Sequence, residues 1–126
     1  MVIRTHFDAA HCINGHPTCG AVHGHRWGVV CTFAVMSHTP SATDRITQDG
    51  MVVDFASLKT TIQSCLPDHK NINEEFGINF ATCEVVGQLL FNAINKLIRE
   101  DQRNRNIALV ELELSENPEC SVVIIP

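Results

Sequence analysis

Two stretches of alternating side chains constrain the fold of this chain more than any other feature of its sequence. Successive side chains of a β-strand point to opposite faces of the sheet, so every second residue shares a face. The first set of alternating residues ends in histidine and the second begins with two histidines, which predicts two strands that each bring histidine to one end of an apolar face. The shared faces are Ile3, Phe7, Ala9 and His11 in residues 2–11, and His23, His25, Trp27, Val29, Cys31, Phe33 and Val35 in residues 23–36.

The three histidines His11, His23 and His25 form a candidate metal site. Three neutral imidazoles leave a zinc ion one open coordination position, which is typical of catalytic rather than structural sites. The alternative is that each ring is an ordinary core or surface group, because an H-x-H pair is too short to be specific by itself. We expect Zn²⁺ as the cofactor, with these three side chains as its ligands.

Composition sets the broad class of the protein. The 126 residues are enough for one domain, 1–126, with a genuine core. A net charge of −5 and nine scattered basic residues argue against general binding to nucleic acids or acidic membranes. No signal peptide or membrane span is evident, so a cytoplasmic protein is the default expectation. Of the six cysteines, Cys31, Cys65 and Cys83 fall within apolar patterns, and we expect reduced thiols.

The remaining patterns predict loops at 12–22 and 37–50, a short strand at 51–53, two helices, and closing strands at 107–116 and 120–125. Asp54 is a candidate N-cap for a helix that reaches Leu66, and Thr82 is a candidate N-cap for a second helix with Glu84 in its first turn. This order predicts an α+β fold in which helices pack on one face of an antiparallel sheet. The apolar stripes of the two helices are Phe55, Leu58, Ile62 and Leu66, and Val85, Val86, Leu89, Leu90, Ala93, Ile94, Leu97 and Ile98.

Two features of the predicted loops are candidates for chemistry. Cys19 lies four residues before His23, where a nearby cation and imidazoles would favour its thiolate. Cys19 is then a base or nucleophile, a fourth zinc ligand, or an ordinary loop cysteine. Asp68 and His69 are adjacent in a turn, where they polarise a common group or simply form a surface loop.

Glu116 is a candidate because of its place in the last long strand pattern. It continues the alternation of Ala108, Val110, Leu112 and Leu114, which are apolar. A carboxylate at the rim of a buried face needs a partner. The alternative is that the strand ends at this residue and turns outward.

Six motifs follow one another along the chain: Phe7-x-Ala9-Ala10-His11, Cys19-x-x-x-His23-Gly24-His25, Gly50-Met51-Val52-Val53-Asp54-Phe55, Asp68-His69-x-x-x-Asn73, Thr82-x-Glu84 and Glu116. In this order they resemble the 6-pyruvoyl-tetrahydropterin synthase family. Each motif is modest alone, but their order over nearly the whole chain is specific. The short Cys-x-x-x-His-Gly-His spacing is similar to that of the bacterial 6-carboxy-5,6,7,8-tetrahydropterin synthases of the queuosine pathway.

The resemblance implies a tunnelling fold (T-fold), in which subunits join their sheets into a barrel as trimers or hexamers, with sites between subunits. It implies zinc bound by the three histidines, and a general base at Cys19. Asp68 and His69 would be a catalytic proton relay, delivered by a neighbouring subunit. Glu116 would anchor the pterin ring during catalysis, with the substrate-binding residues Thr82 and Glu84 close to that pocket.

The resemblance also implies a substrate, 7,8-dihydroneopterin triphosphate. The 6-carboxy branch forms 6-carboxytetrahydropterin and releases triphosphate and acetaldehyde. Two alternatives stay open: a 6-pyruvoyl-tetrahydropterin synthase, which eliminates triphosphate without releasing acetaldehyde, and a non-catalytic module that binds a pterin or a metal. Such a module would retain the pocket and the histidines without turnover.

Overall fold

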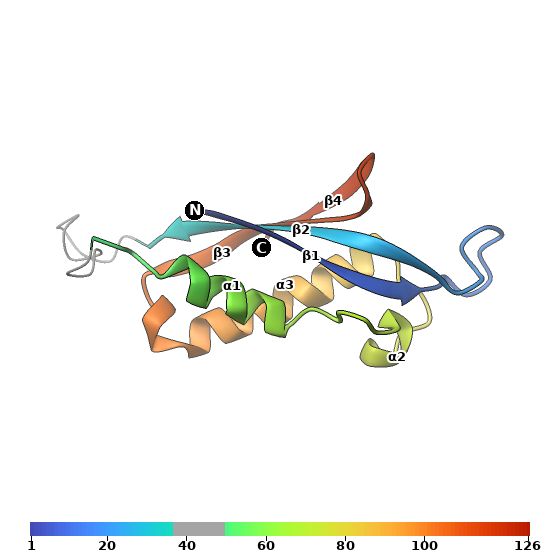
Figure 1. Cartoon of the computed structure of the whole chain (residues 1–126), viewed down its shortest axis with the longest axis horizontal. Helices are drawn as coiled ribbons and strands as arrows, with labels where there is room; N and C mark the ends of the chain where they lie inside the picture. The colour runs from blue at the N-terminus through green and yellow to red at the C-terminus, as the bar shows by residue number, and fades with distance from the viewer. Residues whose placement is uncertain (37–49) are drawn as a thin grey trace.

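The structure, a computed structural model, describes residues 1–36 and 50–126, and the predicted loop at 37–50 therefore lies outside these residues except for Gly50. One antiparallel sheet carries four strands in the order β1-β2-β3-β4. The helices lie together on one face of that sheet (Figure 1), which confirms the predicted α+β fold. The elements are β1 (Val2–His11), β2 (His23–Val35), α1 (Phe55–Ser64), α2 (Ile72–Phe76), α3 (Cys83–Glu100), η2 (Gln102–Asn104), β3 (Ile107–Asn117) and β4 (Cys120–Ile124).

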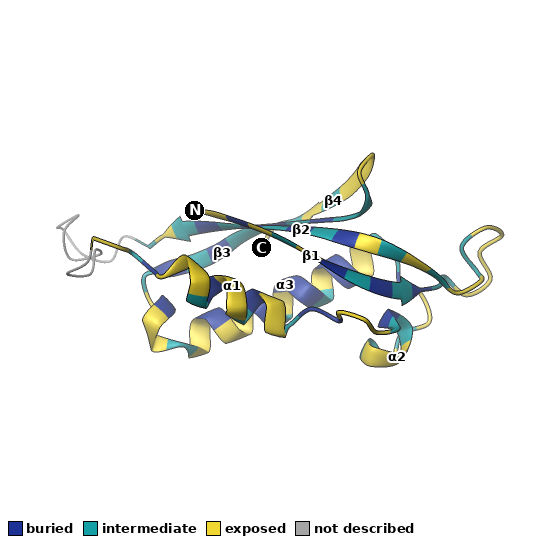
Figure 2. Cartoon of the chain, in the orientation of Figure 1, coloured by how far each residue is buried: buried dark blue, intermediate teal, exposed yellow. Residues whose placement is uncertain are grey.

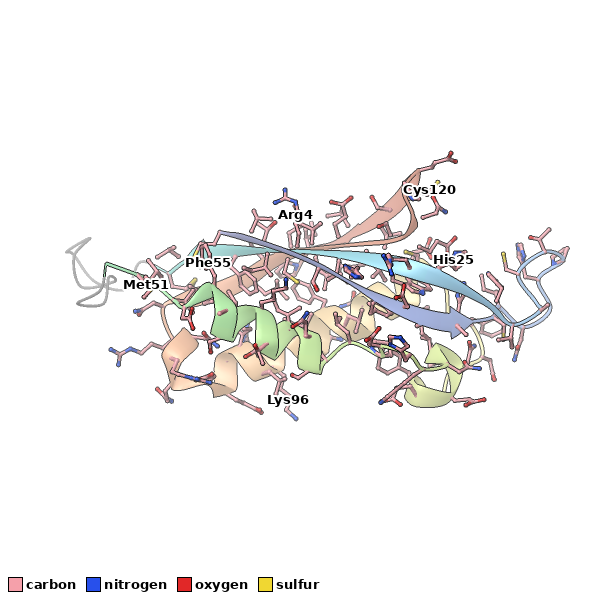
Figure 3. The ribbon with its side chains drawn as sticks, viewed as in Figure 1. Arg4, His25, Met51, Phe55, Lys96 and Cys120 are labelled. Carbon is pink, nitrogen blue, oxygen red and sulfur yellow. The ribbon has the colours of Figure 1, made fainter. Side chains whose placement is uncertain are left out.

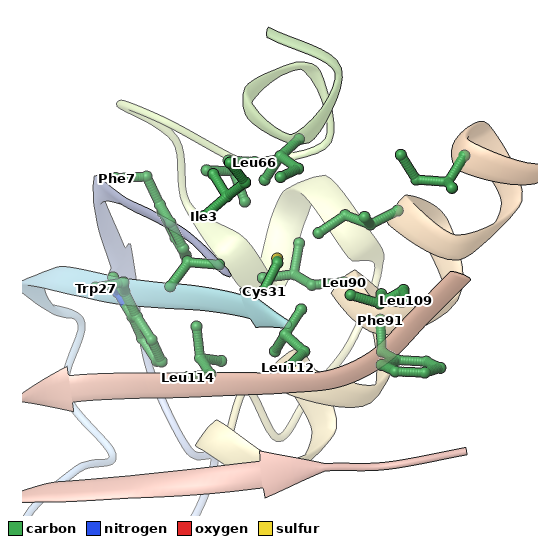
Figure 4. Packing of buried hydrophobic residues seen from close by; sticks show 14 of the residues in the cluster. Ile3, Phe7, Trp27, Cys31, Leu66, Leu90, Phe91, Leu109, Leu112 and Leu114 are labelled. Atoms are coloured by element: carbon green, nitrogen blue, oxygen red, sulfur yellow. The ribbon is translucent and has the colours of Figure 1, made fainter. Parts of the chain in front are cut away.

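The long pairing of β1 with β2 builds the apolar face that the alternation predicts. Its register runs without a break from Val2 opposite Thr32 to His11 opposite His23. Phe7 lies opposite Trp27, and their rings stack with centroids 5.8 Å apart. The indole N–H of the fully buried Trp27 donates to the carbonyl of Ala9 at 3.3 Å, so its polar atom is satisfied inside the core. Figure 4 shows Trp27 next to Leu114 of β3.

Both predicted helix caps are present. The Asp54 carboxylate accepts hydrogen bonds from the backbone N–H groups of Ala56 and Ser57, and the Thr82 hydroxyl accepts one from Val85. These bonds satisfy backbone donors that have no partner within the helix, and so they fix where α1 and α3 begin. Cys65 caps the C-terminal end of α1, which is shorter than the predicted helix to Leu66.

The buried stripe of α3 faces the sheet and the outer surfaces of both layers carry polar residues. Figure 2 shows the dark, buried positions of α3 turned toward the strands. Arg4 projects from the sheet face without helices, and Lys96 projects from the far side of α3 (Figure 3). Three residues of the predicted stripes are nevertheless exposed: Phe55, Val85 and Leu97. The buried residues of α3 are Val86, Gly87, Leu90, Phe91, Ile94 and Ile98, so Phe91 joins the core although the predicted stripe did not include it.

A β-bulge overturns part of the alternation predicted for β3. Thr32 pairs with Glu111 and Phe33 pairs with Leu109, so Val110 is an extra residue with no partner of its own on β2. A bulge of this kind reverses which residues point to a given face. Leu109 is therefore buried before the bulge and Leu112 and Leu114 after it, and placing Ala108 and Val110 on the apolar face was wrong.

Two local predictions also differ from the structure. The strand expected at 51–53 does not form, and these residues instead lead irregularly to the cap at Asp54, with Val53 buried. The short helix α2 was not predicted. It begins at an Asn71 cap and ends at Gly77, whose φ of 63° is the left-handed conformation that favours glycine. Among the described residues, no helix is both long and apolar enough to cross a membrane.

Candidate metal and substrate site

The end of β1 and the start of β2 bring His11, His23 and His25 together. The sheet register places His11 directly opposite His23 and Ala9 opposite His25. The ring centroid of His11 lies 4.5 Å from that of His23 and 5.2 Å from that of His25. One nitrogen of each ring lies within 4.8 Å of the corresponding nitrogens of the other two. The strand geometry thus assembles the three predicted ligands on one face.

Backbone carbonyls orient two of these rings. His11 Nδ1 lies 2.7 Å from the carbonyl of Ala81, and His23 Nδ1 lies 2.8 Å from the carbonyl of Ala21. A carbonyl only accepts, so each Nδ1 carries the proton and each Nε2 keeps a free lone pair. A metal-binding histidine is usually held in this way, by a hydrogen bond from the ring nitrogen that does not bind the metal.

The burial and protonation of His11 are suited to binding a metal cation. Its Nε2 is buried and has no hydrogen-bond partner among the described residues. Burial lowers the pKa of His11 below its ordinary value, so the ring stays neutral. An orphaned buried acceptor costs free energy unless a ligand satisfies it. Three imidazoles with free lone pairs are a donor set that suits zinc.

A cavity of about 320 Å³ lies beside the histidines and brings the predicted substrate-binding residues together. Glu116, Thr82 and Glu84 all line it. The Glu116 carboxylate lies 3.8 Å from His11 Nε2 and is partly exposed, so Glu116 does not turn away from the site. The cavity therefore joins the cluster of histidines to a carboxylate and to the start of α3. Its other lining residues are Ile13, Cys83, Cys120, Ser121 and Val122.

Cys83 is a lining residue that sequence reasoning placed in the core. Its Sγ donates to the carbonyl of Leu114 at 3.3 Å, and burial raises its pKa to about 11. The thiol is therefore neutral at pH 7 and serves as a polarisable wall rather than as a base. Its position between Thr82 and Glu84 is the signal that would have found it.

Cys19 lies in the loop between β1 and β2 and is half-buried. The group of mutually close ligand atoms consists of the three histidines and does not include its sulfur. The same loop contains Ala21, whose carbonyl holds His23. This placement favours a role for the thiol other than that of a fourth ligand.

Asp68 and His69 form a second, separate group with Asp8. One Asp68 carboxylate oxygen accepts a hydrogen bond from the backbone N–H of Asp8 at 2.9 Å, and the other lies 3.0 Å from His69 Nδ1. The bond from Asp8 holds the pKa of the Asp68 carboxyl below its usual value. The His69 N–H donates to the Asp8 carbonyl, and His69 adopts a φ of 58°, which is uncommon without glycine. A depression of about 420 Å³ is lined by both His69 and His25, so the pair borders the histidine cluster without joining it.

Asn73, in the same motif as Asp68 and His69, holds two loops together. Its carbonyl oxygen accepts from the Cys12 N–H, and its amide nitrogen donates to the carbonyls of Cys12 and Ile78. Cys12, which follows His11, is thus tied to the segment before α3.

Comparisons with known proteins point to one family. The sequence profile of a family described as 6-pyruvoyl tetrahydropterin synthase matches residues 1–125. A protein of Archaeoglobus fulgidus, provisionally named a 6-carboxy-5,6,7,8-tetrahydropterin synthase, is 36% identical over 78 residues, and the match spans 60% of each protein.

Two solved structures show the same fold. The 6-pyruvoyl tetrahydropterin synthase of Caenorhabditis elegans superposes with a TM-score of 0.74 at 21% identity, covering 100% of this chain and 94% of the other. A 6-pyruvoyltetrahydropterin synthase of Plasmodium vivax superposes with a TM-score of 0.70 at 17% identity, covering 98% and 94%. The predicted T-fold, with helices on one face of an antiparallel sheet, is confirmed. The chain, matched by the profile over residues 1–125, belongs to the 6-pyruvoyl tetrahydropterin synthase family.

Proposed function

We propose that this protein is a zinc-dependent 6-carboxy-5,6,7,8-tetrahydropterin synthase of the queuosine pathway. Its substrate would be 7,8-dihydroneopterin triphosphate, and its products 6-carboxytetrahydropterin, triphosphate and acetaldehyde. The observation that carries the proposal is the cavity in which Thr82, Glu84 and Glu116 meet beside the histidine cluster. The name of the Archaeoglobus relative favours the 6-carboxy reaction over triphosphate elimination alone.

His11, His23 and His25 would hold the zinc ion, since one nitrogen of each ring lies within 4.8 Å of those of the other two and His11 is kept neutral. When bound there, zinc supplies Lewis-acid polarisation of a substrate oxygen. The carbonyls of Ala81 and Ala21 keep two of the rings in the tautomer that binds a metal.

Glu116 would recognise the pterin ring. The exocyclic amine and the neighbouring ring N–H of a pterin form a pair of donors that matches the two oxygens of a carboxylate. Glu116 is only 32% exposed, and the neutral Cys83 thiol lines the same cavity, so water competes weakly for these bonds. Thr82, the N-cap of α3, and Glu84 in its first turn line the same cavity and would lie close to the ring.

Cys19 would act as the general base and the Asp68–His69 pair as a proton relay. Asp68 accepts from His69 Nδ1, which leaves His69 Nε2 exposed for proton exchange. The resemblance to the family implies that this pair serves the site of a neighbouring subunit, and in its own chain the pair does not join the histidine cluster.

Self-association as a trimer or hexamer would complete those sites. Within the described residues, β1 and β4 are the two edges of the sheet and each pairs on one side only. Exposed apolar residues lie on both edges, Val2 on β1 and Val123 on β4. Joining such edges between subunits would close the sheets into a barrel and cover these side chains.

Product analysis tests this function. Zinc-loaded protein is incubated with 7,8-dihydroneopterin triphosphate, and the products are identified by mass. Formation of 6-carboxytetrahydropterin with one acetaldehyde per triphosphate supports the proposal. Triphosphate release without acetaldehyde would assign 6-pyruvoyl-tetrahydropterin synthase activity instead, and binding without turnover would leave a pterin-binding module.

A further inference from the structure

A compact turn precedes the histidine pair and contains Cys19. Three backbone bonds close it: the Ile13 N–H donates to Cys19 O at 2.8 Å, the His16 N–H to Ile13 O at 3.0 Å, and the Gly20 N–H to His16 O at 3.0 Å. A Cβ at Gly20 would lie 2.6 Å from His16 O, so only glycine permits this approach. These contacts fix the backbone conformation of the segment between β1 and Cys19.

The side chain of His16 completes the turn from inside. Its Nδ1 accepts from the backbone N–H of Cys19 at 3.1 Å and, less closely, from that of Thr18 at 3.4 Å. The Thr18 hydroxyl lies 3.2 Å from the same nitrogen and 3.6 Å from Cys19 Sγ. A side-chain acceptor that binds N–H groups two and three residues ahead is the arrangement that Asn or Asp uses in turns and helix caps.

We propose that His16 is a positioning residue that holds the backbone and thiol of Cys19 in place for proton transfer. This inference rests on the proposed function in one respect, the assignment of Cys19 as the base. Four residues after Cys19 comes His23, and Ala21 between them fixes the His23 ring, so the path of the turn determines where the thiol stands relative to the ligands.

The exposure of His16 separates positioning from folding. The ring is exposed and adds no core packing, and water can replace its hydrogen bonds when it is removed. The loss of stability is therefore small, as for most exposed substitutions. Proton transfer is more sensitive, because small displacements of a catalytic group reduce the rate by up to about 100-fold.

Three substitutions of His16 test the role of its Nδ1 atom. The Asn Oδ1 atom is attached to Cγ as Nδ1 is in histidine, so His16→Asn restores the acceptor. In His16→Gln the oxygen lies one bond further out, and this variant serves as the matched control, together with His16→Ala. We expect kcat to fall about 10- to 100-fold in the Ala and Gln variants with KM little changed, and to return to within about threefold of wild type in the Asn variant.

Measurements that need no turnover accompany the kinetics. Amide hydrogen exchange at Thr18 and Cys19 should accelerate in the Ala and Gln variants and not in the Asn variant, and so should alkylation of Cys19 by iodoacetamide. Zinc content and the melting temperature should stay near wild type in all three. If wild-type protein fails to turn over the pterin, the proposed function fails, and exchange and alkylation still decide whether His16 orders the turn.

The inference is overturned by any of three results. The first is unchanged exchange at the Cys19 amide in His16→Ala. The second is wild-type kcat in His16→Ala when wild-type protein is active. The third is an Asn variant as impaired as the Gln variant, which would show that the Nδ1 acceptor is not what matters.

Discussion

Replacing Glu116 with glutamine removes one charge and one acceptor from the cavity without changing the shape of the side chain. Charge-assisted hydrogen bonds contribute about 1.5–3 kcal/mol each. Glutamine keeps one oxygen as a neutral acceptor and turns a donor toward the ligand's own N–H. Because Glu116 is 32% exposed, solvent screening reduces the difference, and we expect a loss of about 2 kcal/mol. This corresponds to a roughly 30-fold rise in the Kd for a pterin.

Titration of a non-reactive pterin, such as neopterin, into zinc-loaded protein measures this change. Glu113→Gln is the matched control, because Glu113 lies on the same strand but does not line the cavity. The Glu116 charge also raises the pKa of His11, so its removal favours the neutral, metal-binding ring. Zinc content should therefore stay near one per chain in both variants, and the melting temperature should change little.

Equal Kd values for the wild type and Glu116→Gln would refute the reasoning. They would mean that the carboxylate does not contact the ring and that its proximity to His11 has another purpose. A fall in zinc content together with the rise in Kd would instead assign Glu116 to the metal rather than to the pterin.

Four further predictions follow from the site and the loops around it. The double variant His23→Ala/His25→Ala should lose its zinc by elemental analysis, while the single variant His6→Ala, outside the cluster, should keep it. Cys19→Ala should keep zinc and fold but lose about 10²–10⁴-fold in kcat, whereas loss of zinc would make Cys19 a ligand. Asn73→Ala removes side-chain hydrogen bonds to Cys12 and Ile78 and should lower the free energy of unfolding, measured by urea denaturation, by about 2 kcal/mol. The control Asn79→Ala loses one 3.5 Å contact and should stay near wild type. Metal-free protein should lose stability as the pH falls below 6.5, because burial lowers the pKa of His11 below that value and the unfolded chain then binds more protons than the folded one. The variant His11→Asn keeps a donor for the carbonyl of Ala81 and should lose part of this pH dependence, as measured by thermal melts at several pH values.

The histidine cluster could be predicted from sequence because strand alternation is a strict rule. Once β1 and β2 are strands, His11, His23 and His25 must share a face, and an unbroken register carries them to the same end of the sheet. The helix starts were equally accessible, since Asp54 and Thr82 satisfy backbone donors that any helix leaves free.

The bulge at Val110 could not be predicted, because it depends on two strands at once. Nothing in residues 107–116 marks one position as extra until their partners on β2 are known. The strand expected at 51–53 failed for a related reason: its apolar residues suit a strand, but here they lead into the α1 cap and Val53 packs in the core.

The short helix and the turn at His16 were missed for different reasons. With five residues, α2 is too short for a helical period to emerge, although its Asn71 cap and Gly77 were visible signals. His16 acts through a side-chain acceptor that sequence reasoning expects from Asn or Asp, so its exposed ring looked ordinary.

The hydrogen bond between His11 and the carbonyl of Ala81 has a thermodynamic consequence. The next residue, Thr82, caps α3 and lines the cavity, so one dipeptide touches both the metal ligand and the space for the substrate. Any compound that shifts this dipeptide when it binds changes the affinity of the histidines for their ion. Linkage then requires the ion to change the affinity for that compound by the same factor, so the two occupancies are reciprocally coupled even if the two ligands never touch.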